Sequence, residues 1–438
     1  MNPLDGRHGS NASAESDSHT SERRREAAAL AEFRRHSRHP GLQVILEKLH
    51  RGDCVAEDEY RLLSSFLHES SGVSPQYEDA GMAEALPSAS PRGLISGQGT
   101  ACGAQRLAGR CVDGLVDSFT PAQGRLVSSI GIGTYRGAGD VATDHAYAAA
   151  VGCALAGGVN LIDSSLNYRH QRSERAVGMA IRRFVEFGGG ARDEIVVCSK
   201  GGFLVPGAVP SSALADDDVV GGCHSMAPDF LADQIERSRH NLGVETIDVY
   251  YLHNPEVQLQ FVDVAAFHHK MRVAFEFLER SVADGLISYY GTATWDGYVT
   301  GVLSLSEIAD IAHDVAGAGH HFRFVQLPFS MSMREASTAT VQGGATLLDR
   351  AGELGMTVIA SSSLWHGRLA RGLPPEISGL FGGLETDAQR AIQFTRSTPG
   401  ITSALVGMSN PAHVRENLAV THVPGLTSSE RQALQSRL

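Results

Sequence analysis

The sequence predicts an α/β protein whose main part, residues 125–425, is a (β/α)8 barrel, or TIM barrel. After Arg125, short apolar runs alternate with helical stretches, which is typical of a parallel sheet with crossover helices. The alternation gives eight such units in about 300 residues, and this number and length favour a closed barrel. No glycine-rich GxGxxG follows an early strand, which argues against an open dinucleotide-binding sheet.

Each predicted strand is a short apolar run, and each is followed by a stretch with helical periodicity. The predicted strands are 129–134, 159–163, 194–200, 247–253, 288–293, 323–328, 356–361 and 403–407. The predicted helices are 143–156, 173–187, 228–242, 269–284, 299–316, 344–354, 387–397 and 411–420. Asn410 followed by Pro411 is typical of an N-cap and a first helical residue, so free N–H groups are expected there.

The segments outside the barrel are predicted from composition and periodicity. Residues 1–24 are polar and are expected to be a disordered tail. Residues 25–70 have a helical pattern of apolar residues, whereas glycine, serine and proline recur over 71–124, which predicts a linker with a short helix near 107–116. Residues 426–438 are expected to be a C-terminal tail. A solvated appendage and an oligomerisation or docking element are both open readings of the N-terminal extension.

Composition limits the classes of partner. The net charge of −12 argues against a nucleic acid or an anionic membrane as a partner. No run approaches the roughly 20 apolar residues of a membrane span, and the N-terminus lacks the pattern of a signal peptide. The six cysteines show neither CxxC spacing nor a metal-ligand pattern. We therefore expect a cytoplasmic protein without a metal.

Polar side chains stand at the ends of three consecutive predicted strands. The second strand ends at Asp163, with Tyr168 in the loop beyond it, the third ends at Lys200, and the fourth ends at His253. Chemistry in a (β/α)8 barrel lies at the C-terminal ends of the strands, so we expect these four side chains to lie together. The chain has only three lysines, so a lysine would seldom stand at a strand end by chance.

These four residue types suit the protonation of a carbonyl oxygen. A tyrosine has an ordinary pKa of about 10, and an adjacent ammonium favours its ionised form. A buried ammonium needs a carboxylate partner, which Asp163 provides. A histidine beside the phenol can hold the substrate oxygen by a hydrogen bond. Tyr168 is then the acid in a reduction and the base in an oxidation.

The segment 129–420 resembles the aldo-keto reductases. The resemblance rests on GGVNLIDSSLNY, RDEIVVCSKGG and IDVYYLHNPE around the second, third and fourth strands, VQLPFS at the sixth, and LVGMSNPAHVRENL at the last strand and helix. It implies an NAD(P)H-dependent reductase of aldehydes or ketones whose catalytic tetrad is Asp163, Tyr168, Lys200 and His253. The alternative is a cofactor-binding regulatory or docking protein on the same barrel.

The resemblance also implies a site for NADPH, with NADH not excluded. Gln326 is expected to bind the nicotinamide carboxamide, and the family's Ser-Asn pair is replaced by Ala293 and Thr294, so that Thr294 takes part. Ser361 stands where a tyrosine often stacks on the nicotinamide, and Trp365 or Phe203 is expected to cover that face instead. The adenosine end is expected against 409–417. The residues implied in that segment are Ser409, His413, Glu416 and Asn417.

The expected partner is a small carbonyl or alcohol substrate. Trp295, Phe329 and Trp365 are candidate aromatic walls of its pocket. These walls suit a hydrophobic, aromatic or sugar-like compound. His224 and the pair at 320–321 are spaced unsuitably for a compact metal site. A homo-oligomer or a partner contact through the N-terminal extension is also possible.

Overall fold

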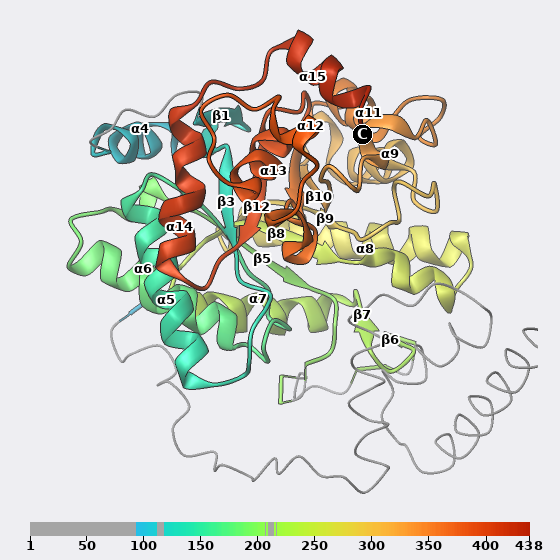
Figure 1. The fold of residues 1–438 in the computed structure, drawn as a ribbon. Helices are drawn as coiled ribbons and strands as arrows, with labels where there is room; N and C mark the ends of the chain where they lie inside the picture. The colour runs from blue at the N-terminus through green and yellow to red at the C-terminus, as the bar shows by residue number, and fades with distance from the viewer. Residues whose placement is uncertain (1–92, 112–117, 206, 209–213, 216) are drawn as a thin grey trace, which may run out of the picture. The chain divides into compact units, whose positions relative to one another are not determined.

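A closed barrel of eight parallel strands forms the centre of the structure, a computed structural model that describes residues 93–111, 118–205, 207–208, 214–215 and 217–438 (Figure 1). The strands follow one another around the barrel in the order β10-β11-β12-β3-β4-β5-β8-β9. They are β3 (Ile130–Gly133), β4 (Leu161–Asp163), β5 (Val196–Gly201), β8 (Ile247–His253), β9 (Ile287–Ala293), β10 (Phe322–Pro328), β11 (Thr357–Ser361) and β12 (Ser403–Gly407). The predicted barrel is confirmed, and all eight strands lie within two residues of their predicted starts and one of their predicted ends.

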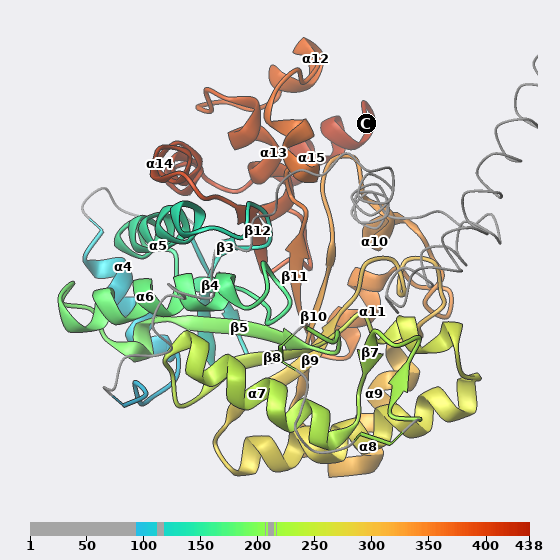
Figure 2. The same ribbon diagram turned by 90° about the horizontal axis from the view of Figure 1, so that it is seen from below.

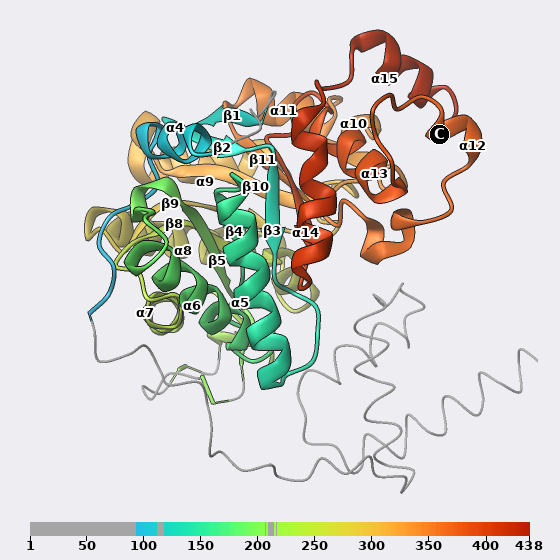
Figure 3. The same cartoon turned by 60° about the vertical axis from the view of Figure 1, so that its left-hand side comes forward.

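A helix follows each strand and covers the outside of the barrel. These helices are α5 (Val141–Ala156), α6 (Arg172–Glu186), α7 (Pro228–Leu242), α8 (Val264–Ala283), α9 (Leu305–Ala316), α11 (Leu347–Glu353), α13 (Asp387–Arg396) and α14 (Pro411–Leu418). Figure 3 shows α14 beside α5, against which it packs. Two helices begin about five or six residues from their predicted starts because side-chain caps define them: Asp263 accepts from Ala266 N and starts α8, and Ser304 accepts from Glu307 N and starts α9.

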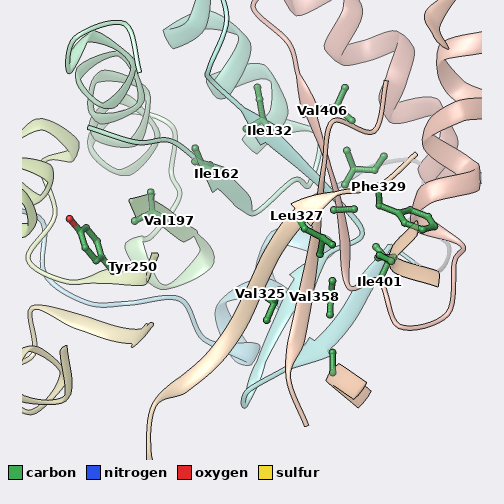
Figure 4. Packing of buried hydrophobic residues seen from close by; sticks show 14 of the residues in the cluster. Ile132, Ile162, Val197, Tyr250, Val325, Leu327, Phe329, Val358, Ile401 and Val406 are labelled. Atoms are coloured by element: carbon green, nitrogen blue, oxygen red, sulfur yellow. The ribbon is translucent and has the colours of Figure 1, made fainter. Parts of the chain in front are cut away.

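Side chains alternate between the two faces of the barrel strands, as the period of two requires. One buried cluster fills the barrel interior and contains Leu161, Cys198, Tyr251 and Phe324. The neighbouring residues face outward into a second cluster between the barrel and its helices (Figure 4). Its members in that view include Ile162, Val197, Tyr250 and Val325. Because inward positions recur every second residue, the final inward position of each strand lies at the C-terminal rim.

A hairpin closes the opposite end of the barrel. Strands β1 (Phe119–Ala122) and β2 (Arg125–Ser128) pair in antiparallel fashion and lead directly into β3. Ala122 and Val127 belong to the buried cluster of the barrel interior. The hairpin therefore lies across the N-terminal ends of the strands.

Helix α4 (Ala101–Gly109) lies within the segment that the sequence predicts as a linker. In the described part of the segment 71–124, the structure has α4 and β1, and its helix begins at Ala101 rather than near 107 as expected. Few apolar residues mark this helix, of which Ala104 and Leu107 are buried. Ion pairs from Arg106 and from the C-cap residue Arg110 to the turn before β5 help to hold it: Arg106 Nη2 lies 2.6 Å from Asp193 Oδ1, and Arg110 pairs with Glu194. The predicted tail 1–24 and helical segment 25–70 lie outside the described residues.

The remaining elements are short. They are β6 (Val219–Val220), β7 (His224–Ser225), α10 (Glu335–Thr338), α12 (Pro375–Ser378), α15 (Ser428–Gln435) and the 3-10 turns Arg192–Glu194, Pro255–Gln260, Gly317–Gly319, Trp365–Ala370 and Ala419–His422. Within the expected tail 426–438, Thr427 and Glu430 form a capping box that starts α15. No helix in the part of the chain that the structure describes is long and apolar enough to cross a membrane.

Candidate active site

Three charged or titratable side chains meet at the C-terminal rim of the barrel. Asp163 ends β4, Lys200 is the second-to-last residue of β5, and His253 ends β8. Each continues the inward series of its strand, at two residues from Leu161, Cys198 and Tyr251 respectively. The strand pattern therefore directs these side chains to the mouth of the barrel, and β4, β5 and β8 are neighbours in the sheet.

Lys200 is the centre of this cluster. Its Nζ lies 2.6 Å from Asp163 Oδ1 and donates to Ser164 O at 2.9 Å. The same nitrogen lies 4.7 Å from the centroid of the Tyr168 ring. Burial alone would lower the pKa of Lys200, but the Asp163 carboxylate and the Tyr168 phenol outweigh burial and raise it above its ordinary value. Lys200 is therefore a buried ammonium with a carboxylate on one side and a phenol on the other.

A tightly shaped loop carries Tyr168 to this ammonium. The three residues that follow it, Arg169, His170 and Gln171, all have left-handed backbone angles, with φ of 51°, 52° and 70°. Such angles are costly for residues with side chains and persist where surrounding contacts hold them. Arg169 supplies such contacts, because its Nε donates to Ala138 O at 2.8 Å and its guanidinium pairs with the buried Asp144.

His253 lies beside the phenol in its neutral form. The rings of Tyr168 and His253 are 5.8 Å apart between centroids and meet edge to face at 76°. Burial, the Lys200 ammonium and His224 together hold the pKa of His253 well below its ordinary value. The Ser165 hydroxyl lies 3.4 Å from His253 Nδ1. A neutral imidazole at this place can donate a hydrogen bond without delivering a proton.

Gln326 joins the same cluster through a contact that the sequence did not predict. Its Nε2 donates to Asp163 Oδ2 at 2.8 Å, so the two carboxylate oxygens are held by Gln326 and Lys200 separately. Gln326 comes two residues after the inward-facing Phe324 in β10, and this spacing alone predicts that its side chain points into the barrel mouth. The structure thus places the residue expected to bind the carboxamide next to Asp163 and Lys200.

The other residues expected to bind a cofactor form two groups. Thr294 follows β9, its N donates to Gln326 O at 2.9 Å, and Ser361 ends β11. Asn417 is buried in α14, whereas Ser409 before that helix, and His413 and Glu416 within it, are exposed. Both groups lie on segments that follow the C-terminal ends of the strands.

Two buried polar atoms are available to hydrogen-bond a bound ligand. Thr294 Oγ1 and Asn417 Oδ1 are buried and have no hydrogen-bond partner within the described residues. Buried polar atoms are normally paired, so a ligand group or a water can complete the bonding at each of these two atoms. Gly133 and Gly407 lie opposite each other in neighbouring strands at this rim, and a Cβ on Gly407 would meet nothing within 4 Å. These residues fit a dinucleotide with polar groups at both ends.

The predicted aromatic walls divide into two kinds. The prediction for Phe329 is wrong: it is 1% exposed and stacks on Phe394 outside the barrel. Trp295 is 38% exposed and stacks on His366 at 5.8 Å. Tyr135, 43% exposed, meets the Tyr168 ring edge on at 4.9 Å, a contact that the sequence did not predict.

Trp365, the third predicted aromatic wall, is covered by Arg368, whose guanidinium carbon lies 4.7 Å from the centroid of its ring.

Among the described residues, no group of three histidine, cysteine, aspartate or glutamate side chains is arranged to hold a metal ion.

Comparison with known proteins agrees with this architecture. The model of the aldo/keto reductase family matches residues 129–373. An aldo/keto reductase from Klebsiella pneumoniae, solved with NADP and acetate, is 22% identical with a TM-score of 0.54, over 74% of this chain and 94% of that one.

Two further solved structures have the same fold. An aldo-keto reductase from Bacillus halodurans in its holo form is 18% identical, with a TM-score of 0.53, over 73% of this chain and 95% of that one. The glycerol dehydrogenase of Gluconobacter oxydans is 19% identical, with a TM-score of 0.53, over 73% of this chain and 94% of that one. With its closed eight-stranded barrel and a family match over more than half of its length, the chain belongs to the aldo/keto reductase family.

Proposed function

We propose that this protein is an NADPH-dependent carbonyl reductase that converts an aldehyde or a ketone into an alcohol. The observation that carries the proposal is the buried Lys200 ammonium, held between the Asp163 carboxylate and the Tyr168 phenol, with the neutral His253 beside them. This arrangement favours ionisation of a phenol next to a hydrogen-bond donor, which a carbonyl oxygen needs as it takes up a proton.

The side chains divide the work on the carbonyl group. When bound, the reduced nicotinamide supplies the hydride to the carbonyl carbon. Tyr168 donates its phenolic proton to the carbonyl oxygen, and the Lys200 ammonium stabilises the phenolate that remains. Asp163 fixes the ammonium, and His253 donates a hydrogen bond that orients the oxygen. In the reverse direction, the phenolate of Tyr168 takes the proton of the alcohol.

We assign the two ends of the cofactor to the two residue groups at the rim. Thr294, Gln326 and Ser361 would hold the nicotinamide end, and the unpartnered Thr294 Oγ1 supports this. The segment from Ser409 to Asn417 would hold the adenosine end, where the positive end of the α14 dipole favours an anionic group. The solved Klebsiella structure with NADP favours NADPH, and NADH is the alternative for the assay.

The rim favours a substrate with an apolar or aromatic body. Tyr135 lies on one side of the phenol, and Phe203 packs against His253 at 5.1 Å. Exposed aromatic surface at the mouth of a barrel is well suited to a flat or hydrophobic carbonyl compound.

The test is a scan of NADPH and NADH oxidation at 340 nm against a panel of aldehydes and ketones. Turnover by the wild type and its loss in Tyr168→Phe, with NADPH binding retained, is the expected result. A wild type that binds NADPH and turns over no member of the panel would favour a regulatory or docking protein. Wild-type turnover in Tyr168→Phe would show that another group is the acid.

A further inference from the structure

His224 lies in the long connection between β5 and α7, outside the eight strands of the barrel, and it is completely buried. It belongs to β7, which Figure 2 shows near the end of the barrel where β5 terminates. Its backbone pairs with Phe203, and Ser225 N donates to Gly202 O at 2.8 Å. The connection is thereby held against the last residues of β5, next to the proposed active site.

Both ring nitrogens of His224 are engaged. The amide nitrogen of Gln258 lies 2.8 Å from Nδ1, and an amide nitrogen can only donate, so Nδ1 accepts. Nε2 therefore carries the proton, and it donates to the carbonyl oxygen of His253 at 2.8 Å. Burial, the main cause, lowers the pKa of His224 to about 4, so the ring is neutral at neutral pH. With no free nitrogen, the ring is not available as a metal ligand or as an acid.

Two further features are shaped around this hydrogen bond. The ring of Phe203 stands edge on to both histidines, 5.2 Å from His224 and 5.1 Å from His253. Gly202 has a φ of +145°, and a Cβ there would lie 2.6 Å from His224 Nε2 and 3.0 Å from His253 O. Glycine is thus required at 202 because a side chain would displace the bond between the two histidines.

We propose that His224 is a positioning residue that fixes the backbone of His253 and, with Phe203, the direction of its imidazole toward Tyr168. The inference rests on the proposed function. The ladder with β9 reaches His253, since Asn254 N donates to Ala293 O at 2.7 Å, but the ladder with β5 ends at Leu252. On the β5 side, the bond from His224 therefore holds the His253 carbonyl where strand pairing does not. A displacement of about 1 Å in a catalytic group can cost 100-fold in rate.

The test compares His224→Leu with His224→Gln. The leucine cannot donate to His253 O, and we expect kcat to fall about 10- to 100-fold while the Kd for NADPH stays at the wild-type value. The glutamine places an amide N–H near the former Nε2, so it should recover most of kcat. His320→Leu is the matched control, because His320 is also a buried histidine, precedes β10 at the other end of the barrel, and should lower the melting temperature without lowering kcat.

Two results would overturn the inference. One is a kcat in His224→Leu equal to that of His320→Leu. The other is a crystal structure of His224→Leu in which the Tyr168 and His253 rings keep their 5.8 Å separation and 76° angle. The second measurement needs no substrate, so it decides the inference even where the carbonyl panel gives no turnover, an outcome that would count against the proposed function alone.

If His224→Leu fails to fold, Gln258→Leu takes its place. It removes the amide that holds Nδ1, so the ring is oriented by its bond to His253 O alone, and the same loss of kcat is expected to a smaller degree. An unchanged kcat together with unchanged ring geometry in that variant would refute the inference.

Discussion

Replacing Lys200 with methionine removes the charge at the centre of the site while preserving much of the side-chain volume. The change deletes the 2.6 Å bond to Asp163 and the 2.9 Å bond to Ser164 O, and it leaves the Gln326 amide on a carboxylate that is 4% exposed. Breaking a buried pair by removing one partner typically costs about 3–5 kcal/mol.

Protonation sets an upper limit on that cost. Neutralising an ordinary aspartate, whose pKa is about 3.9, requires about 4 kcal/mol at pH 7. We therefore expect the free energy of unfolding of Lys200→Met to fall by about 3–4 kcal/mol at pH 7, and by less as the pH approaches 4. Turnover should fall by about 100-fold or more, because the phenolate of Tyr168 loses its stabilising charge.

The assay is denaturant unfolding at pH 7 and pH 5, together with kcat against pH. Lys200→Met/Asp163→Asn is the control: removal of the unpaired charge should restore most of the stability and none of the turnover. Lys200→Arg should not rescue turnover, since a planar guanidinium cannot replace a point charge between two oxygens. Near-normal turnover in Lys200→Met, or a double variant no more stable than the single one, would refute this account of the cluster.

Three other outcomes are expected. Thr294→Val removes the unpartnered Oγ1, so calorimetry should show unchanged or higher stability and titration a Kd for NADPH raised about tenfold; an unchanged Kd would remove Thr294 from the cofactor site. A histidine in the unfolded chain has a pKa near 6.5, whereas the pKa of the folded His224 is about 4. On acidification between these values, the free energy of unfolding of the wild type should therefore fall by up to about 3 kcal/mol more than that of His224→Gln. Equal losses would contradict the neutral, buried state of His224. Deleting 1–120 should melt at a lower temperature than deleting 1–92, because the first change also removes the Arg106–Asp193 pair and α4; equal melting temperatures would show that α4 contributes nothing.

The barrel and the proposed tetrad were predictable because both depend on local periodicity. Apolar runs of fixed length give the strands, and the period of two places Asp163, Lys200 and His253 on the inward face at the strand ends. Helix starts were less predictable, since a single side chain such as Asp263 or Ser304 decides them.

Contacts between distant segments were not readable from the sequence. The bond between His224 and His253 joins residues 29 apart, and that between Gln326 and Asp163 joins residues 163 apart. Nothing in the residue type of His224 or Gln326 tells these contacts apart from those of a buried histidine or glutamine with a purely structural role. The start of helix α4 was misplaced for a related reason, because glycine and alanine allow close packing without an apolar pattern: a Cβ on Gly103 would lie 1.9 Å from Asp193 O.

The hairpin of β1 and β2 has a kinetic consequence for the whole molecule. Gln123 at its tip donates to Gly355 O at 2.9 Å, and Tyr289 donates to Gln123 O at 3.1 Å, so it is fastened to the starts of two strands. The N-terminal end of the barrel is therefore covered, and ligands of the proposed site would enter and leave at the rim. If the proposed cofactor lies deeper there than the substrate, the two would bind in a compulsory order, with the cofactor first to arrive and last to leave. An occupant of the rim would then block both.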